Sequence, residues 1–166
     1  MRTSSFVLHC SLVFAIAVLL FSITAWADTP SQRATLRGIR AVAVVVEDTH
    51  ADAQRDGLTR RQLQTDVEQR LRQAGIKVHN DAPGFLDVFV NTLKIESGFY
   101  AYAIRVQFRQ RVRMERNLKI AALASTWEAP SVVGTVGTRA LRDVRGSVRD
   151  RVDEFINAYL EQNPKR

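Results

Sequence analysis

The chain has 166 residues, a formal net charge of +7 and a single cysteine, Cys10. This length fits one domain that can bury a sizeable core. Because Cys10 lies near the amino terminus within an apolar stretch, the rest of the chain can form no disulfide and has no thiol nucleophile, which excludes a disulfide scaffold and cysteine catalysis.

The first 27 residues have the layout of a secretory signal peptide. Arg2 supplies a positive start, residues 12–21 form an apolar core, and Ala25 and Ala27 place small residues where a signal peptidase cleaves. We therefore expect cleavage after Ala27 and export. The lack of disulfides favours a bacterial envelope protein, located in the periplasm, over a eukaryotic secreted one.

A retained signal-anchor is the alternative, because residues 6–27 are long enough to span a bilayer. Polar side chains dilute this run and favour its removal: His9, Ser11, Ser22 and Thr24. Removal would leave residues 28–166 with a net charge of about +6, since the leader carries one arginine and no acid.

Arginine carries most of the positive charge, because the chain has only four lysines, Lys77, Lys94, Lys119 and Lys165. The guanidinium group is a planar set of donors that suits carboxylates and phosphates. We expect an exported basic protein to contact an anionic envelope component, such as a lipid headgroup, lipopolysaccharide or an acidic glycan, or an acidic protein surface. Peripheral membrane association fits this charge, whereas the compartment argues against nucleic acid.

The beginning of the mature chain shows three segments of different composition. Residues 28–37 are polar and unpatterned, which predicts a short tether. Residues 39–46 form a nearly continuous apolar run that is typical of a strand buried on both faces. The acidic stretch 47–57 then predicts a loop.

Local signals predict the first helix at both of its ends. Thr59 and Gln62 form a capping-box pattern, and apolar residues at helical spacing continue the helix over 59–74. Gly75 stands where a left-handed residue ends a helix. Residues 76–79 predict a short strand, parallel to the first if the connection is a right-handed crossover.

Strand patterns dominate the second half of the chain. Apolar runs predict strands over 86–96, 102–114 and 120–128, joined by tight turns. The glycine- and proline-containing stretch 129–137 predicts an irregular connection. An apolar stripe then predicts a helix over 138–162.

This order of elements predicts a single α+β domain over residues 38–162. We expect a two-layer sandwich with a four- to five-stranded sheet, mixed but mostly antiparallel, and two helices on one face. In element order, residues 38–160 resemble small bacterial envelope accessory domains, such as the amino-terminal domain of TolB and the lipopolysaccharide-assembly lipoprotein of the outer membrane. The chain departs from the lipoprotein because it has no lipobox. The resemblance implies an adaptor or binding role and assigns no residues.

The clearest chemical pattern lies on the strand predicted at 102–114. Its apolar residues share one parity, and alternation would place a positive row about 25 Å long on the other face. The row consists of Arg105, Arg109, Arg111 and Arg113. Gln110 interrupts the apolar parity and predicts a bulge. The row could bind an anion or an acidic surface, or it could be a solvated face whose charges discourage edge pairing.

A second set of candidates follows the first two predicted strands. Asp48 and His50 follow the first strand, and His79 and Asp81 follow the second. If these strands are parallel neighbours, both pairs emerge at one sheet edge and could hold zinc or act as acid and base in a small metal-dependent hydrolase. Their spacing matches no metal motif, and ordinary loop polarity is the alternative.

The third candidate is the stretch 134–138, Gly-Thr-Val-Gly-Thr, before the last predicted helix. Free backbone amides at such a place can hold an anion, but the stretch lacks the lysine of a P-loop. Glycines that turn the chain and a capping Thr138 are the alternative. Hydrolase and metalloprotease motifs are absent from the sequence. We therefore expect a non-enzymatic binding or accessory domain without a cofactor or resident metal, with the hydrolase as the alternative.

The leader provides the first test. Intact-mass measurement of the exported protein should find a chain that begins at Asp28. A retained anchor would put the basic flank of Arg33, Arg37 and Arg40 on the disfavoured side of the membrane, or else reverse the topology and leave the domain in the cytoplasm. Cleavage avoids this conflict. A full-length species that requires detergent would contradict both the cleavage and the periplasmic location.

Overall fold

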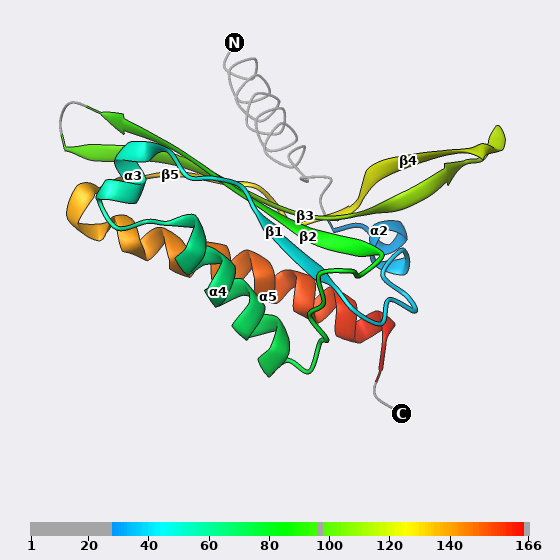
Figure 1. Cartoon of the computed structure of the whole chain (residues 1–166). Coiled ribbons are helices and arrows are strands. Elements are labelled where there is room, and N and C mark those ends of the chain that lie inside the picture. Colours follow the sequence, from blue (N-terminus) through cyan, green and yellow to red (C-terminus); the bar gives the residue numbers. More distant parts are fainter. Residues whose placement is uncertain (1–27, 96–97, 165–166) are drawn as a thin grey trace, which may run out of the picture.

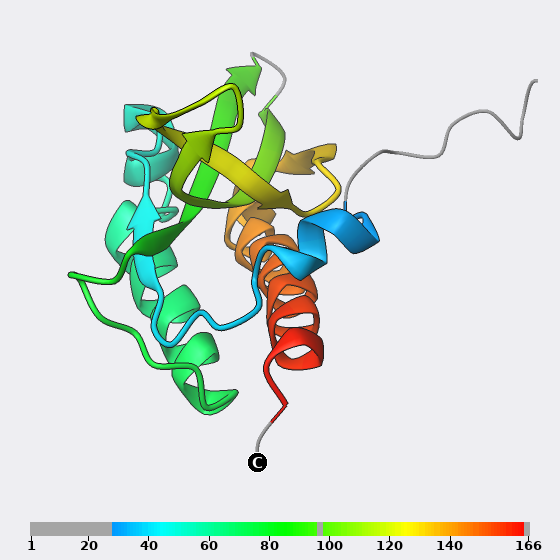
Figure 2. The same ribbon diagram turned by 90° about the vertical axis from the view of Figure 1, so that its right-hand side faces the viewer.

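The fold is a two-layer α+β sandwich, as predicted, in which two long helices cover one face of a five-stranded mixed sheet (Figure 1). The computed structural model describes residues 28–95 and 98–164. The expected leader, residues 1–27, and its cleavage after Ala27 lie outside this part. The two long helices, α4 (Arg60–Gln73) and α5 (Val144–Gln162), run side by side beneath the sheet (Figure 2). No described helix has both the length and the hydropathy needed to cross a bilayer.

The third strand lies at the centre of the sheet. The strands are β1 (Ala43–Val46), β2 (Gly84–Ile95), β3 (Phe99–Met114), β4 (Asn117–Glu128) and β5 (Val132–Gly137). β1 pairs with β2 in parallel, and the other pairings among these strands are antiparallel. β2 flanks one side of β3, while β5 and β4 follow one another along its other side.

Beyond the end of β2, the sheet continues as a two-stranded ribbon. β2 begins at Gly84, which pairs with Gln110, so the last four residues of β3 have only β4 beside them in the described part. This ribbon, residues 111–123, projects past the helices (Figure 1) and is called the arm below. Near its tip the register shifts, because Arg113 pairs with Ala121 whereas Met114 pairs with Asn117. Three residues of β4, 118–120, are therefore left out of the pairing.

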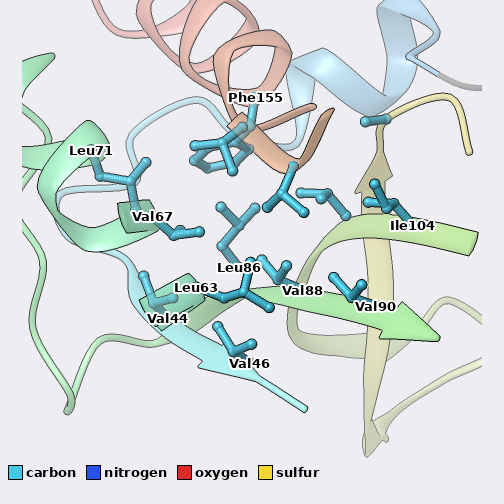
Figure 3. Packing of buried hydrophobic residues seen from close by; sticks show 14 of the residues in the cluster. Val44, Val46, Leu63, Val67, Leu71, Leu86, Val88, Val90, Ile104 and Phe155 are labelled. Carbon is cyan, nitrogen blue, oxygen red and sulfur yellow. The ribbon is translucent and has the colours of Figure 1, made fainter. Parts of the chain in front are cut away.

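The core lies between the sheet and the two helices (Figure 3). Alternation turns one parity of β2 and β3 toward the helices, and these side chains are at most 3% exposed: Leu86, Val88, Val90, Ile104, Val106 and Phe108. On α5, the buried ring of Phe155 lies 5.6 Å from that of Phe108 and 5.3 Å from that of Trp127. From α4, the fully buried residues are Leu63, Val67 and Leu71.

Both predicted ends of α4 are confirmed. Thr59 and Gln62 make the reciprocal hydrogen bonds of a capping box. Gly75 has a φ of 82°, in the left-handed region, and its N–H donates to the Arg72 carbonyl. The N–H of Ile76 donates to the Leu71 carbonyl at 3.0 Å, which completes a Schellman ending.

The prediction of a polar tether at 28–37 is wrong. This segment contains the short helix α2 (Pro30–Ala34), with a capping box formed by Thr29 and Gln32. Leu36 is fully buried in the core, and the Asp28 carboxylate accepts a hydrogen bond from the indole nitrogen of Trp127 at 2.8 Å. The burial of Leu36 and the hydrogen bond from the distant Trp127 hold the segment in place. Neither contact can be inferred from local hydropathy.

Three predictions around β1 also need correction. The strand expected at 39–46 is shorter, and the strand expected at 76–79 is reduced to a single parallel bridge between Val42 and Val78. The expected loop at 47–57 contains the helix α3 (Ala51–Arg55). Only Ala53 of α3 is buried, so the segment carries too little apolar pattern to identify a helix.

The expected connection at 129–137 is also different, because most of it forms β5. Gly134 of β5 pairs with Tyr102, and a Cβ on this glycine would lie 2.8 Å from the Tyr102 ring. Glycine thus lets the aromatic ring lie across the neighbouring strand. The predicted last helix begins as the 3-10 helix η1 (Thr138–Asp143), and α5 follows it.

The bulge expected at Gln110 lies instead on the partner strand. Phe108 pairs with Trp127 and Arg109 pairs with Ser125, so the intervening Thr126 of β4 is the extra residue. Gln110 keeps its place in the ladder and donates from Nε2 to the Thr126 hydroxyl at 2.9 Å. Gln110 is therefore polar, although it alternates with apolar residues, because its side chain contacts the bulge.

Gly84 provides a test of the packing at the centre of the sheet. Gly84→Ala should lower the free energy of unfolding by about 1–3 kcal/mol, because crowding a packed core forces it to shift. The added Cβ would lie 2.5 Å from Cζ of the buried Phe108 ring. Chemical denaturation measures the change.

Gly146→Ala in α5 is the matched control for this substitution. A Cβ there meets nothing closer than the Arg149 side chain at 3.9 Å, and alanine should raise stability by about 0.5–1 kcal/mol. If both variants were stabilised, Phe108 would have room to move and the tight packing at Gly84 would be disproved.

Candidate functional site

The four arginines predicted to form a row lie on the sheet face opposite the helices. Arg105, Arg109, Arg111 and Arg113, called the arginine row below, share one parity of β3, and the other parity supplies Ile104, Val106 and Phe108 to the core. Arg105, Arg111 and Arg113 are exposed, and Arg109 is half-buried. Arg113 lies eight positions after Arg105 along the strand, a span of about 25 Å. Neither α4 nor α5 covers this face (Figure 1).

Two of these arginines lie over aromatic rings of β2. The register places Arg105 opposite Phe89 and Arg109 opposite Phe85. The guanidinium carbon of Arg105 is 5.0 Å from the centre of the Phe89 ring, and that of Arg109 is 5.8 Å from the centre of the Phe85 ring. Such contacts use the flat face of the guanidinium group and leave the N–H donors at its edge free for an anion.

One acid lies within ion-pair distance of the arginine row in the described part of the chain. Nη1 of Arg109 is 3.3 Å from Oδ2 of Asp87, a β2 residue that is only 4% exposed. A buried carboxylate is costly unless a cation and hydrogen bonds compensate it. Arg109 therefore has a structural task that the other three arginines do not share.

The outer two arginines belong to the arm. Arg111 pairs with Leu123 across the ribbon, and Arg113 pairs with Ala121. Nη1 of Arg113 donates to the carbonyl of Leu118 at 2.7 Å, in the stretch of β4 that lies out of the pairing. The positive row therefore continues from the centre of the sheet onto the projecting arm.

The other end of this open face is apolar. Four large apolar residues there are 40% to 80% exposed: Leu93, Ile95, Phe99 and Val133. The register brings Ile95 beside Phe99, and it brings Val133 beside Ala103, two residues before Arg105. The open face thus changes along β3 from apolar to cationic.

The two histidine–aspartate pairs are not brought together. His79 follows the bridge to Val42 and therefore lies near the start of β1. Asp48 and His50 follow the end of β1. The length of the strand alone separates the two positions by about 10 Å. His50 caps α3 and lies 3.3 Å from Asp52, and Asp81 lies 3.9 Å from His79. Among the described residues, no group of three or more His, Cys, Asp or Glu side chains is placed to hold a metal.

The glycine-containing stretch 134–138 does not form an open loop. Its backbone pairs with β3 from Gly134 to Gly137. Thr138 donates both its N–H and its hydroxyl to the carbonyl of Gly98, so its side chain does not cap the helix that follows. The amides expected to be free for an anion are therefore part of a strand.

Sequence reasoning missed a polar cluster around Asp56, directly after α3. Oδ2 of Asp56 accepts hydrogen bonds from Lys94 at 2.7 Å and from the Tyr100 hydroxyl at 2.6 Å. These two bonds, that from Lys94 above all, lower the pKa of Asp56, while burial first and the bond to Asp56 second raise the pKa of Tyr100. The cluster ties α3 to β2 and β3. No local spacing reveals it, because Tyr100 is 44 positions from Asp56.

Comparisons with known proteins add little to this picture. No protein-family model matches the chain, and no curated protein matches it. Among solved structures, the chain is similar to a PelC dodecamer from Paraburkholderia phytofirmans, with 11% sequence identity and a TM-score of 0.42. The match covers 81% of this chain and 92% of the PelC chain.

The pair of Arg109 and Asp87 can be tested by a double-mutant cycle. Arg109→Gln should lower the free energy of unfolding by about 1–3 kcal/mol, because it leaves the buried carboxylate without its cation. In an Asp87→Asn background the same substitution should cost much less. Equal costs in both backgrounds, measured by urea denaturation, would show that the pair does not couple.

Proposed function

We propose that this protein is an exported, non-enzymatic binding domain whose arginine row holds an anionic ligand or an acidic partner surface. The observation that carries the proposal is that three of the four guanidinium groups in the row lack an acidic partner among the described residues, on a sheet face that neither long helix covers. In the described part of the chain, Arg105, Arg111 and Arg113 have no acid within ion-pair distance, whereas most other ion pairs join the helices or their flanks.

Electrostatics support this function over a purely solvated face. Like charges repeated along one strand repel one another, which costs stability unless an anion lies across them. Two of the four groups are also held over aromatic rings, which limits their freedom before any ligand arrives. Preorganised donors bind more tightly because less side-chain entropy is lost on binding.

The metal-dependent hydrolase is the weaker candidate. It requires Asp48, His50, His79 and Asp81 to converge, and they lie at different ends of β1. Asp48 instead lies 3.6 Å from Arg60 at the start of α4. The separated pairs offer no common point at which an ion or a water molecule could be activated.

The proposal is tested by removing charge from the row without disturbing Asp87. A protein with Arg105→Gln, Arg111→Gln and Arg113→Gln should bind dextran sulfate and lipopolysaccharide about tenfold to a hundredfold more weakly at low salt, because each cation near an anionic surface contributes independently. Raised salt should narrow the difference. Fluorescence anisotropy of labelled polyanion provides the measurement.

The matched control removes three exposed arginines elsewhere, Arg139→Gln, Arg142→Gln and Arg149→Gln, which lie on η1 and α5. This protein has the same net charge as the first triple variant and should bind almost as well as the parent. If both triple variants lose binding equally, net charge and not the arginine row determines the affinity, and the proposal fails.

A further inference from the structure

We propose that the arm docks on an anionic lipid bilayer, with its apolar side chains at the membrane interface and its arginines on the lipid phosphates. This inference rests on the proposed function, because it names the anionic partner of the arginine row. It adds a second element, the apolar residues of the arm, which an interaction with a purely polar anion would not use.

The arm exposes apolar side chains that contribute nothing to the core. Leu118 is 64% exposed, Leu123 is 52% exposed and Ile120 is 44% exposed. None of the three belongs to the buried cluster between sheet and helices. A two-stranded ribbon without a core beneath it is marginally stable in water, and a group of exposed apolar residues marks an interaction surface.

The same ribbon is strongly basic. It carries one acidic residue, Glu115, and four cationic residues, Arg111, Arg113, Arg116 and Lys119. Membrane-surface segments combine these two properties, because apolar area enters the interface while long cationic side chains reach back to the phosphates. Each Arg or Lys near an anionic leaflet adds to the attraction.

The conformation of the arm also favours a membrane, and not an added β-strand, as its binding partner. β4 is an edge strand in the described part of the chain, and such edges can pair with a second copy or an extended peptide. Residues 118–120, however, lie out of the β3–β4 pairing, and an irregularity of this kind disrupts an edge for strand addition. Arg113 fixes this stretch through its hydrogen bond to the Leu118 carbonyl.

Charge argues against a second copy as the occupant. Pairing two β4 strands would bring two arms side by side, each with an excess of three positive charges. Like charges across adjacent strands are destabilising. A leaflet that contains anionic lipid neutralises the same charges, so the bilayer is the occupant that satisfies both the apolar and the basic side chains.

The first experiment measures co-sedimentation of the exported protein with vesicles of phosphatidylglycerol and phosphatidylcholine. Leu118→Ser combined with Ile120→Ser should reduce partitioning by tenfold or more, since burial of a single leucine side chain is worth about that factor. Val133→Ser, at the apolar end of the open face and 80% exposed in the parent, is the control and should bind normally. The inference would be overturned if both variants lost vesicle binding equally, or if only the Val133→Ser control lost it.

The second experiment places a reporter on the arm. Leu118→Trp should show a blue-shifted emission when vesicles containing phosphatidylglycerol are added, and no shift with phosphatidylcholine alone. In the protein that begins at Asp28, Trp127 is the one native tryptophan, and because it is fully buried it provides a constant background. A Val133→Trp protein should show no shift. An unshifted Leu118→Trp emission with bound vesicles would show that the arm stays in water and would disprove its insertion.

Two further outcomes separate this inference from the proposed function. If the triple arginine variant loses dextran sulfate binding while the Leu118 and Ile120 variants keep full vesicle binding, the arginine row binds anions but the arm does not dock on lipid. If sedimentation equilibrium detects dimers that the Leu118→Ser and Ile120→Ser substitutions dissociate, a second copy occupies the arm and the lipid inference is overturned.

Discussion

Alternation along β3 is the constraint on which the rest of the molecule depends. One parity of this strand supplies Ile104, Val106 and Phe108 to the core, and the other parity carries the arginine row. A shift of one residue in its pairing would turn guanidinium groups toward Phe155 and turn Phe108 toward water. The hydrophobic core therefore fixes the face on which Arg105 and Arg109 lie, and the same alternation, continued into the arm, places Arg111 and Arg113 on that face.

Features carried by neighbouring residues could be predicted from the sequence, and features that join distant residues could not. The ends of α4 follow from Thr59, Gln62 and Gly75, and the arginine row follows from alternation within one strand. By contrast, the segment around α2 has local signals in its capping-box residues Thr29 and Gln32, but its contact with the core depends on Trp127, which lies 99 positions from its partner Asp28. The histidine–aspartate candidates depended on a parallel pairing that the chain forms only as a single bridge. Register between segments is not encoded in either segment alone.

The uncovered face gives the two phenylalanines of β2 an uncommon position. Phe85 and Phe89 lie on the solvent side of the sheet, where arginine side chains cover them. The same contacts keep the guanidinium groups of Arg105 and Arg109 near the sheet, in a row that extends for about 25 Å to Arg113. A line of separate donors of this length suits an extended surface or a polymer better than a single small anion, which a concave pocket would enclose.

Asp28 ties the beginning of the described chain to the centre of the core. Its N–H donates to the Glu128 carbonyl at 3.1 Å, and its carboxylate accepts hydrogen bonds from Arg33 and from the buried indole of Trp127. If the leader is cut after Ala27, this residue becomes the new terminus. An aminopeptidase that removed it would strand the indole N–H without an acceptor, at a cost in stability. A terminus at Asp28 would be held against the domain by β4, by Arg33 and by the buried indole, instead of hanging free in solvent.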